Sequence, residues 1–138
     1  IAYFGHKDAQ QAIVIKRMTE DLNMDVRIKV MPTVRERDGL AMSSRNGYLS
    51  SDERRVAPTV YRALQLARDL IKLGDRDAAN IRSEMRKMLS PVVSKVDYIS
   101  IVDPKDFKEI KTIKGGVLVA VAVWIGETRL IDNIEVKT

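Results

Sequence analysis

The pattern of apolar and polar residues changes twice in the first quarter of the chain. Residues 1–5 are mostly apolar and end in glycine, which indicates a buried strand running into a turn. Between about Asp8 and Leu22 the pattern has helical spacing, and Asp8 is a candidate N-cap. Residues 25–31 alternate with period two, which predicts a strand that Pro32 ends. Together these elements form a βαβ unit, which we expect to be parallel with a right-handed crossover.

One stripe of the helix and one face of the second strand are expected to be buried in this unit. The residues are Gln11, Ile15, Met18 and Leu22 on the helix and Val26, Ile28 and Val30 on the strand. A strand, a glycine turn and a helix with polar side chains at its start are typical of the ligand-binding end of a Rossmann-like sheet. Two strands cannot form a stable domain alone. We therefore expect the rest of the sheet to be absent or supplied by another chain.

The pattern after residue 50 predicts two helices. Ser50 and Glu53 match a capping box, and Gly74 is a natural stop for the first helix. Pro58 either kinks this helix or lies in the first turn of a new one. The second helix is expected at about residues 77–89. The residues expected to face the core are Val56, Val60, Ala63, Leu64, Ala67, Leu70 and Ile71 in the first helix and Ala78, Ile81, Met85 and Met88 in the second.

Three strands are predicted in the last part of the chain. Residues 96–102 form the first, and residues 105–110 are expected to form a helical turn. Residues 117–124 are apolar throughout, which predicts a central strand covered on both faces. Residues 128–136 form an edge strand, with Leu130 and Ile134 as core candidates. We expect an antiparallel sheet with the helices on one face.

A loop from Asp38 to Leu49 separates the two regions, and its two glycines bracket two serines, one arginine and one asparagine. Glycine allows positive φ and the close approach of a ligand. Serine hydroxyls, backbone N–H groups and a guanidinium all suit phosphate oxygens. Lys7 lies beside the start of the first helix, where anions bind readily. We expect Lys7 and the loop to meet in one pocket that grips a triphosphate; a long connection without function is the alternative.

Composition narrows the classes of function. Hydrophobic residues make up 45% of the 138 positions and charged residues 31%, which indicates a folded domain. There is no cysteine, which excludes disulfides and cysteine nucleophiles and fits a cytosolic location. No apolar run approaches the ~20 residues of a membrane span. The net charge of +5 would suit nucleic acid or nucleotide phosphates, but acidic residues are mixed among the basic ones and aromatic residues are only 5%.

Four motifs, in order along the chain, resemble the bacterial pantothenate synthetase family. They are Phe4–Gln11, Pro32–Arg35, Asp38–Asn46 and Arg129–Asn133. The third is similar to the lysine-methionine-serine-lysine-serine signature of class I-type nucleotidyltransferases. The resemblance covers nearly the whole chain and implies the C-terminal half of the enzyme. Residues 1–33 would then be a piece of a Rossmann-like nucleotidyltransferase domain and residues 34–138 a small α+β lid domain, with a hinge near Thr33 and Val34.

The resemblance also implies a reaction, in which ATP activates pantoate as pantoyl adenylate and β-alanine then displaces AMP to give pantothenate. It implies Mg²⁺ bound through the ATP phosphates, no metal ligands from the chain, and a cytoplasmic, homodimeric full-length enzyme without nucleic-acid or membrane partners. The chain alone is expected to be inactive, because an N-terminal domain would be missing. The alternatives are the lid of another class I-type adenylyltransferase, a basic nucleic-acid-binding module, and a structural domain without activity.

The resemblance assigns roles residue by residue. The implied catalytic residues are Lys7, Ser43, Ser44 and Arg45; the ATP-binding residues are Gly5, Lys7, Asp8, Val34, Met42, Ser43, Ser44 and Arg45; and Gln11 would bind pantoate. The residue types alone agree for the cations and hydroxyls, whereas Asp8 would repel phosphates and suits ribose hydroxyls better.

Two other features receive structural interpretations. His6 stands where the family typically has glutamate, and we expect a solvent-exposed side chain without a catalytic role. Arg129, Asp132 and Asn133 are expected to form a structural, hydrogen-bonded corner.

Overall fold

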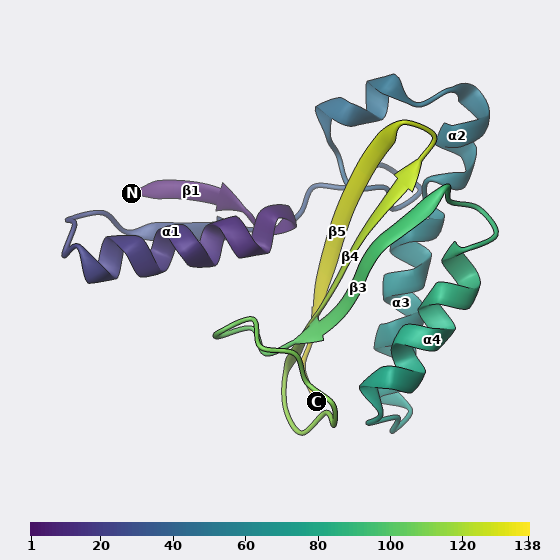
Figure 1. Ribbon diagram of the computed structural model, residues 1–138. Coiled ribbons are helices and arrows are strands. Elements are labelled where there is room, and N and C mark those ends of the chain that lie inside the picture. The colour runs from purple at the N-terminus through teal and green to yellow at the C-terminus, as the bar shows by residue number, and fades with distance from the viewer.

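The structure is a computed structural model that describes residues 1–138, and it contains two separate β-sheets (Figure 1). In the first, β1 (Ala2–Gly5) pairs in parallel with β2 (Ile28–Met31). The 3₁₀ turn η1 (His6–Asp8) and helix α1 (Ala9–Asp21) connect these strands. The predicted strand–helix–strand order and the parallel pairing are therefore confirmed.

The second sheet is antiparallel, with the order β3-β4-β5 and β4 in the centre. Helices α3 and α4 lie against one face of it, and the β1–α1–β2 unit extends from its other side (Figure 1). Strand β4 is buried along nearly its whole length, as predicted for a central strand. The elements of this region are η2 (Ser44–Tyr48), α2 (Ser51–Val56), α3 (Thr59–Lys72), α4 (Ala78–Leu89), β3 (Lys95–Val102), β4 (Val117–Ile125) and β5 (Thr128–Val136).

Local sequence signals set the helix ends. The Ser50 hydroxyl accepts a hydrogen bond from Glu53 N (3.2 Å), and the Glu53 carboxylate accepts one from Ser50 N (2.8 Å), which confirms the capping box. Pro58 separates α2 from α3 and lies at the N-cap position of α3, so the second of its two predicted roles is the observed one. Gly74 follows the end of α3 with φ +108°, a conformation that glycine adopts at low cost.

The main core lies between the helices and β3–β5, and it confirms the predicted faces of both helices. Val56, Leu70 and Met88 are only partly buried at its edge. No helix is both long enough and apolar enough to cross a membrane. The principal core residues are Val60, Ala63, Leu64, Ala67, Ile71, Ala78, Ile81, Met85 and Leu89 from the helices and Ile99, Ile101, Val117, Val119, Val121, Val123, Ile125, Leu130 and Val136 from the strands.

The predicted buried stripe of α1 is wrong. Gln11, Met18 and Leu22 are exposed, and Ile15 is only half-buried. The buried side chains are the small ones, Ala9, Ala12 and Thr19. Ala9 packs against Val102, Leu118 and Phe107 of the second region, so contact between the two regions decides which face of α1 is covered. Val14 and Met18, two of the larger apolar side chains of α1, are 60% and 45% exposed.

The second strand is shorter than predicted. It begins at Ile28, and Val26 and Val30, expected on its buried face, are 39% and 42% exposed. Asp8 lies at the N-cap position of α1, but its side chain makes no capping hydrogen bond because η1 precedes the helix directly. Gly5 is also not part of a glycine turn: it ends β1 with an extended backbone, at φ −75°.

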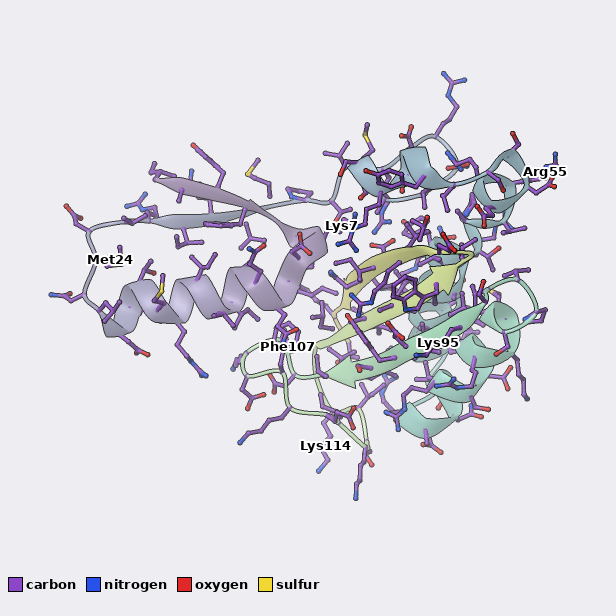
Figure 2. The ribbon with its side chains drawn as sticks, turned by 45° about the horizontal axis from the view of Figure 1, so that its top comes forward. Lys7, Met24, Arg55, Lys95, Phe107 and Lys114 are labelled. Carbon is purple, nitrogen blue, oxygen red and sulfur yellow. The ribbon has the colours of Figure 1, made fainter.

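The helical turn predicted at residues 105–110 lies earlier in the chain, at residues 103–107. The chain makes a single hydrogen-bonded turn there, with Phe107 N donating to Asp103 O (2.9 Å). Phe107 itself adopts φ +60° and lies beneath the start of α1 (Figure 2). The positive φ ends the turn, because a residue in the left-handed conformation cannot continue a right-handed helix.

Candidate functional site

Lys7 lies in η1, where the first unit meets the second (Figure 2). Its Nζ is 3.5 Å from the carbonyl oxygen of Met42, a residue 35 positions away in the loop. The turn and the loop therefore touch at this contact, and the triphosphate pocket expected between them stays a prediction. Burial lowers the pKa of Lys7 from its ordinary value; Asp8 and Asp132 act in the opposite direction, and Arg45 lowers it further. A partly buried amine beside another cation favours an anionic ligand.

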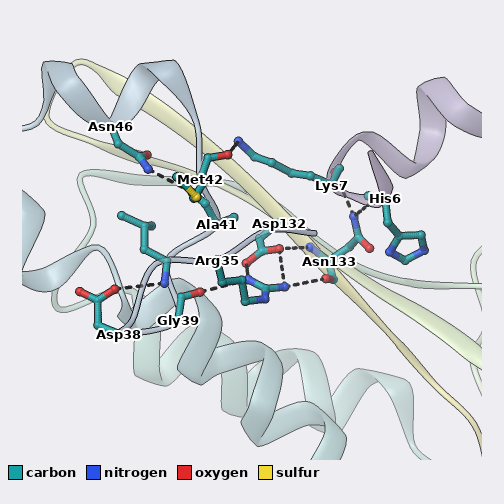
Figure 3. Close-up of polar contacts among 11 residues, drawn as sticks. His6, Lys7, Arg35, Asp38, Gly39, Ala41, Met42, Asn46, Asp132 and Asn133 are labelled. Atoms are coloured by element: carbon teal, nitrogen blue, oxygen red, sulfur yellow. Dashed lines mark hydrogen bonds and ion pairs between the residues drawn. The ribbon is translucent and has the colours of Figure 1, made fainter. Parts of the chain in front are cut away.

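Asn133 fixes the backbone of the Lys7 turn. Its Nδ2 donates to the carbonyl oxygens of His6 (2.9 Å) and Lys7 (3.0 Å), which lie more than 120 residues earlier in the sequence (Figure 3). Asn133 is only 3% exposed, so water competes little for these bonds. Asn133 of β5 thus holds the carbonyls of η1, and this fixes the backbone from which the Lys7 side chain extends. His6 is half-buried rather than exposed as expected.

A buried ion pair lies next to the hydrogen bonds that Asn133 makes to the Lys7 turn. Arg35 Nη1 is 2.5 Å from Asp132 Oδ2, and Nη2 is 3.0 Å from Oδ1. Arg35 also donates to Gly39 O (3.1 Å) and to Asn133 O (3.4 Å), and its guanidinium lies 3.9 Å from the centre of the Tyr61 ring (Figure 3). One arginine therefore ties the segment after the first unit to the loop, to β5 and to α3.

These contacts correct part of the prediction of a corner made by Arg129, Asp132 and Asn133: Asn133 N does donate to Asp132 Oδ1 (2.8 Å), but Arg129 does not join them. Asp132 bonds to Arg35 and Asn133 bonds to the Lys7 turn, whereas Arg129 donates to Asp97. Neighbouring residues of a strand point to opposite faces, so they reach different partners. The signal that could have found these roles is the Asp-Asn pair inside an apolar strand, because buried polar groups need partners.

The loop is built around Gly39 and its neighbours rather than being an open connection. Gly39 adopts φ +95°, whereas Gly47, expected to share this freedom, lies inside η2 without a positive φ. The Asp38 carboxylate accepts from Leu40 N (3.3 Å) and pairs with Arg54 (2.7 Å), and Arg54 lowers the pKa of Asp38. The hydroxyl of Ser43 accepts from Arg45 N (3.2 Å), so it caps η2.

Gly39→Ala is expected to destabilise the protein by about 1–3 kcal/mol. The added Cβ would overlap the Tyr61 ring, and φ +95° is strained for any residue with a side chain. Urea unfolding monitored by Trp124 fluorescence measures the change. Gly115→Ala is the matched control, because a Cβ there meets nothing within 4 Å. Equal unfolding midpoints for the two variants would contradict this account of the loop.

A cavity of about 720 Å³ lies between the start of α1 and the open face of the second sheet. Of the predicted site residues, Lys7, Asp8 and Gln11 line it, together with Asn133 and Arg129. Arg45 lies outside it, beside Arg129 in a neighbouring hollow at the tip of β4 and β5.

The other predicted site residues, Gly5, Val34, Met42, Ser43 and Ser44, do not line either hollow. The Val34 carbonyl accepts from Met42 N (2.9 Å), and the Val34 N–H donates no hydrogen bond within the chain. No group of three or more His, Asp or Glu side chains is placed to hold a metal ion. The chain therefore offers cations, hydroxyls and backbone groups at this site, an arrangement suited to a substrate that carries negative charge.

Comparison with known proteins identifies relatives over the whole of this arrangement. Residues 1–135 match the family model described as pantoate-beta-alanine ligase. A pantothenate synthetase from Caldicellulosiruptor saccharolyticus is 54% identical over 137 residues, which are 99% of this chain and 49% of that protein. The chain spans about half the length of the curated relatives it matches.

Solved structures are similar over the same extent. The crystal structure of pantothenate synthetase from Thermus thermophilus has a TM-score of 0.93 and 42% identity, covering 99% of this chain and 50% of that one. A pantoate-beta-alanine ligase from Francisella tularensis, complexed with beta-gamma ATP and beta-alanine, has a TM-score of 0.61 and 28% identity, covering 96% of this chain and 42% of that one.

Proposed function

Because the chain belongs to the pantoate-beta-alanine ligase family, we propose that it supplies the C-terminal half of an enzyme that joins pantoate to β-alanine with ATP. The observation that carries this proposal is the 3.5 Å approach of Lys7 Nζ to Met42 O. This contact brings a cation next to the start of α1 together with the Asp38–Leu49 loop, here called the serine-rich loop. The amine of Lys7 and the hydroxyls of the loop are both suited to binding a polyphosphate. The complex of the Francisella tularensis relative with beta-gamma ATP and beta-alanine supports the same substrates.

The proposed reaction has two steps. A carboxylate oxygen of pantoate attacks the α-phosphorus of ATP, the bond from that phosphorus to the bridging oxygen breaks, and pyrophosphate leaves. The amine of β-alanine then attacks the acyl carbon of pantoyl adenylate, loses a proton, and displaces AMP. Such transfers depend on alignment and on positive charge around the phosphate oxygens.

The residues of this chain fit different parts of that task. Lys7 would contact the phosphates, and Ser43, Ser44 and Arg45 would close over them from the loop. Gln11, at the start of α1, would hydrogen-bond pantoate. The remaining assignments, stated here as proposals, are Gly5 and Asp8 for the ribose hydroxyls, the Val34 N–H for the adenine edge, and Met42 for the nucleotide.

We further propose that residues 1–33 belong to a Rossmann-like ATP- and pantoate-binding domain and residues 34–138 to a lid. The separate sheets support this division. The apolar side chains exposed on the first unit, which include Val14, Met18, Leu22 and Val30, would be covered by the rest of the larger domain. Mg²⁺ carried by the ATP phosphates and a homodimeric enzyme stay predictions from the resemblance, and light scattering of the full-length protein tests the second.

Pantoate-dependent exchange of labelled pyrophosphate into ATP tests the function in the full-length protein. We expect exchange with pantoate and formation of pantothenate and AMP after β-alanine is added. Other short hydroxy acids serve as controls, because a different adenylyltransferase would prefer one of them. Absence of exchange with pantoate would contradict the proposal. Nucleic-acid binding that falls steeply with salt would instead support the alternative basic module.

A further inference from the structure

Arg129 is a second cation in the cavity that contains Lys7. It lies near the start of β5, on the face that looks toward α1, and lines the 720 Å³ cavity. Residues 129 and 133 are four positions apart on one strand, a separation of about 13 Å. Because Asn133 holds the Lys7 turn, this is the distance along β5 between Arg129 and the residue that anchors Lys7.

The guanidinium of Arg129 is held in one orientation by its neighbours. Its Nε donates to Asp97 Oδ2 (2.7 Å), and its central carbon lies 6.0 Å from the centre of the Tyr98 ring. Asp97 is fixed in turn by Trp124 Nε1 (2.9 Å) and lies 3.5 Å from the Lys95 amine. Arg129, followed by Trp124 and Lys95, lowers the pKa of Asp97, which therefore stays ionised at neutral pH.

Both terminal nitrogens of Arg129 remain available. The protein contacts of its guanidinium are made through Nε, and neither Nη atom has a hydrogen-bond partner in the chain. The side chain is 34% exposed. The nearby Arg45 donates to the carbonyl oxygen of Arg129 (3.4 Å), so the serine-rich loop lies alongside. The two free Nη groups form one edge of the guanidinium plane, and such an edge suits bidentate binding of carboxylate or phosphate.

We propose that Arg129 binds an oxyanion of a substrate through its two Nη groups, in the cavity that Lys7 also lines. This inference rests on the proposed function. Among the oxyanions of its substrates, the pantoate carboxylate is the attacking nucleophile, which leaves two candidates for a bidentate contact. One is the β- or γ-phosphate of ATP and the other is the carboxylate of β-alanine. Asp97 is a positioning residue in this arrangement, because it acts only through Arg129.

A structural alternative is that Arg129, Asp97 and Trp124 only fasten three neighbouring strands at the rim of the sheet. That role predicts a loss of stability in an Arg129 variant without any substrate-selective change in KM. The two interpretations therefore differ in a kinetic measurement rather than in stability alone.

The experiment compares Arg129→Gln with the wild type in the full-length enzyme, measuring KM for ATP, pantoate and β-alanine and the pantoate-dependent pyrophosphate exchange. A charge-assisted bidentate contact predicts a rise of about tenfold to a hundredfold in one KM. If the anion is the carboxylate, KM for β-alanine rises, exchange is retained, and the penalty disappears with 3-aminopropanamide as the amine. If it is a phosphate, KM for ATP and for pyrophosphate rises instead. Asp97→Asn is expected to change the same KM by a smaller factor.

All KM values within twofold of the wild type in a folded Arg129→Gln enzyme would overturn the inference. Should that variant fail to fold, Arg129→Lys is measured in the same way, because it keeps the charge but loses the planar fork. A wild-type enzyme without pantoate-dependent exchange would contradict the proposed function itself. Normal exchange and unchanged KM values would remove only the role given to Arg129.

Discussion

Lys7→Ala in the full-length enzyme is expected to slow pantoyl-adenylate formation by about a hundredfold to a thousandfold, the loss typical of removing one charge-stabilising group from a reacting centre. Lys7 is the cation that meets the loop at Met42. Because the Lys7 carbonyl rather than its amine is held by Asn133, the fold should survive the truncation. Single-turnover release of pyrophosphate measures the rate.

Two comparisons sharpen this prediction. Lys16→Ala removes an exposed lysine of α1 outside the main cavity and should leave the rate unchanged. In the wild type, burial lowers the pKa of Lys7, so its charge is lost at a lower pH than for a free lysine and the rate should fall there. Arginine stays charged across this range, so Lys7→Arg should move the alkaline limb to higher pH. A normal rate for Lys7→Ala would show that another group contacts the phosphates.

Asp132→Ala is expected to destabilise the protein by about 3–5 kcal/mol, because it leaves Arg35 without its carboxylate partner in a largely buried position. The Asp132 side chain is 2% exposed and that of Arg35 is 18% exposed. The change is a large fraction of the about 5–15 kcal/mol that stabilises an ordinary domain. Urea unfolding monitored by the fluorescence of Trp124, the single tryptophan of the chain, measures it.

The matched control for this variant is Glu135→Ala, an exposed carboxylate on the same strand that should be close to neutral. The double variant Arg35→Ala/Asp132→Ala closes a mutant cycle. It should be less destabilised than the sum of the two single variants, because no unpaired charge is left buried. Additive effects would mean that the two side chains do not depend on each other.

Much of the second region could be predicted because its local and tertiary signals agree. The capping box at Ser50, the stop at Gly74 and the apolar run of β4 each appear as expected. The face of α1 could not be predicted in this way. Its spacing shows only that a helix forms, and the neighbour that covers Ala9 comes from residues 102–118. Hydrophobicity alone favours burial of Val14 and Met18, and both are exposed.

The candidate site was predictable in its parts but not in its connections. Lys7 and the serine-rich loop could be recognised by residue type and by their place near a helix start. The atoms that hold Lys7 could not, because Asn133 follows it by 126 positions and short-range spacing carries no information on such a contact. The structure joins the two through β5, a strand that sequence patterning identifies only as an edge strand.

The contacts that β5 makes with the Lys7 turn and with Arg35 depend on the two-residue loop of the hairpin that joins β4 to β5. Gly126, at φ +58°, begins the turn that sets Asn133 opposite Ala120 and Asp132 opposite Val121. Sliding the strand by a single step would exchange its two faces. The Asp132 carboxylate would then point at the carbonyls of η1 and repel them. The Asn133 amide would lie next to Arg35 in place of the carboxylate. The geometry of the cavity beside Lys7 is thus encoded at the opposite end of the strand, in the pairing that Gly126 permits.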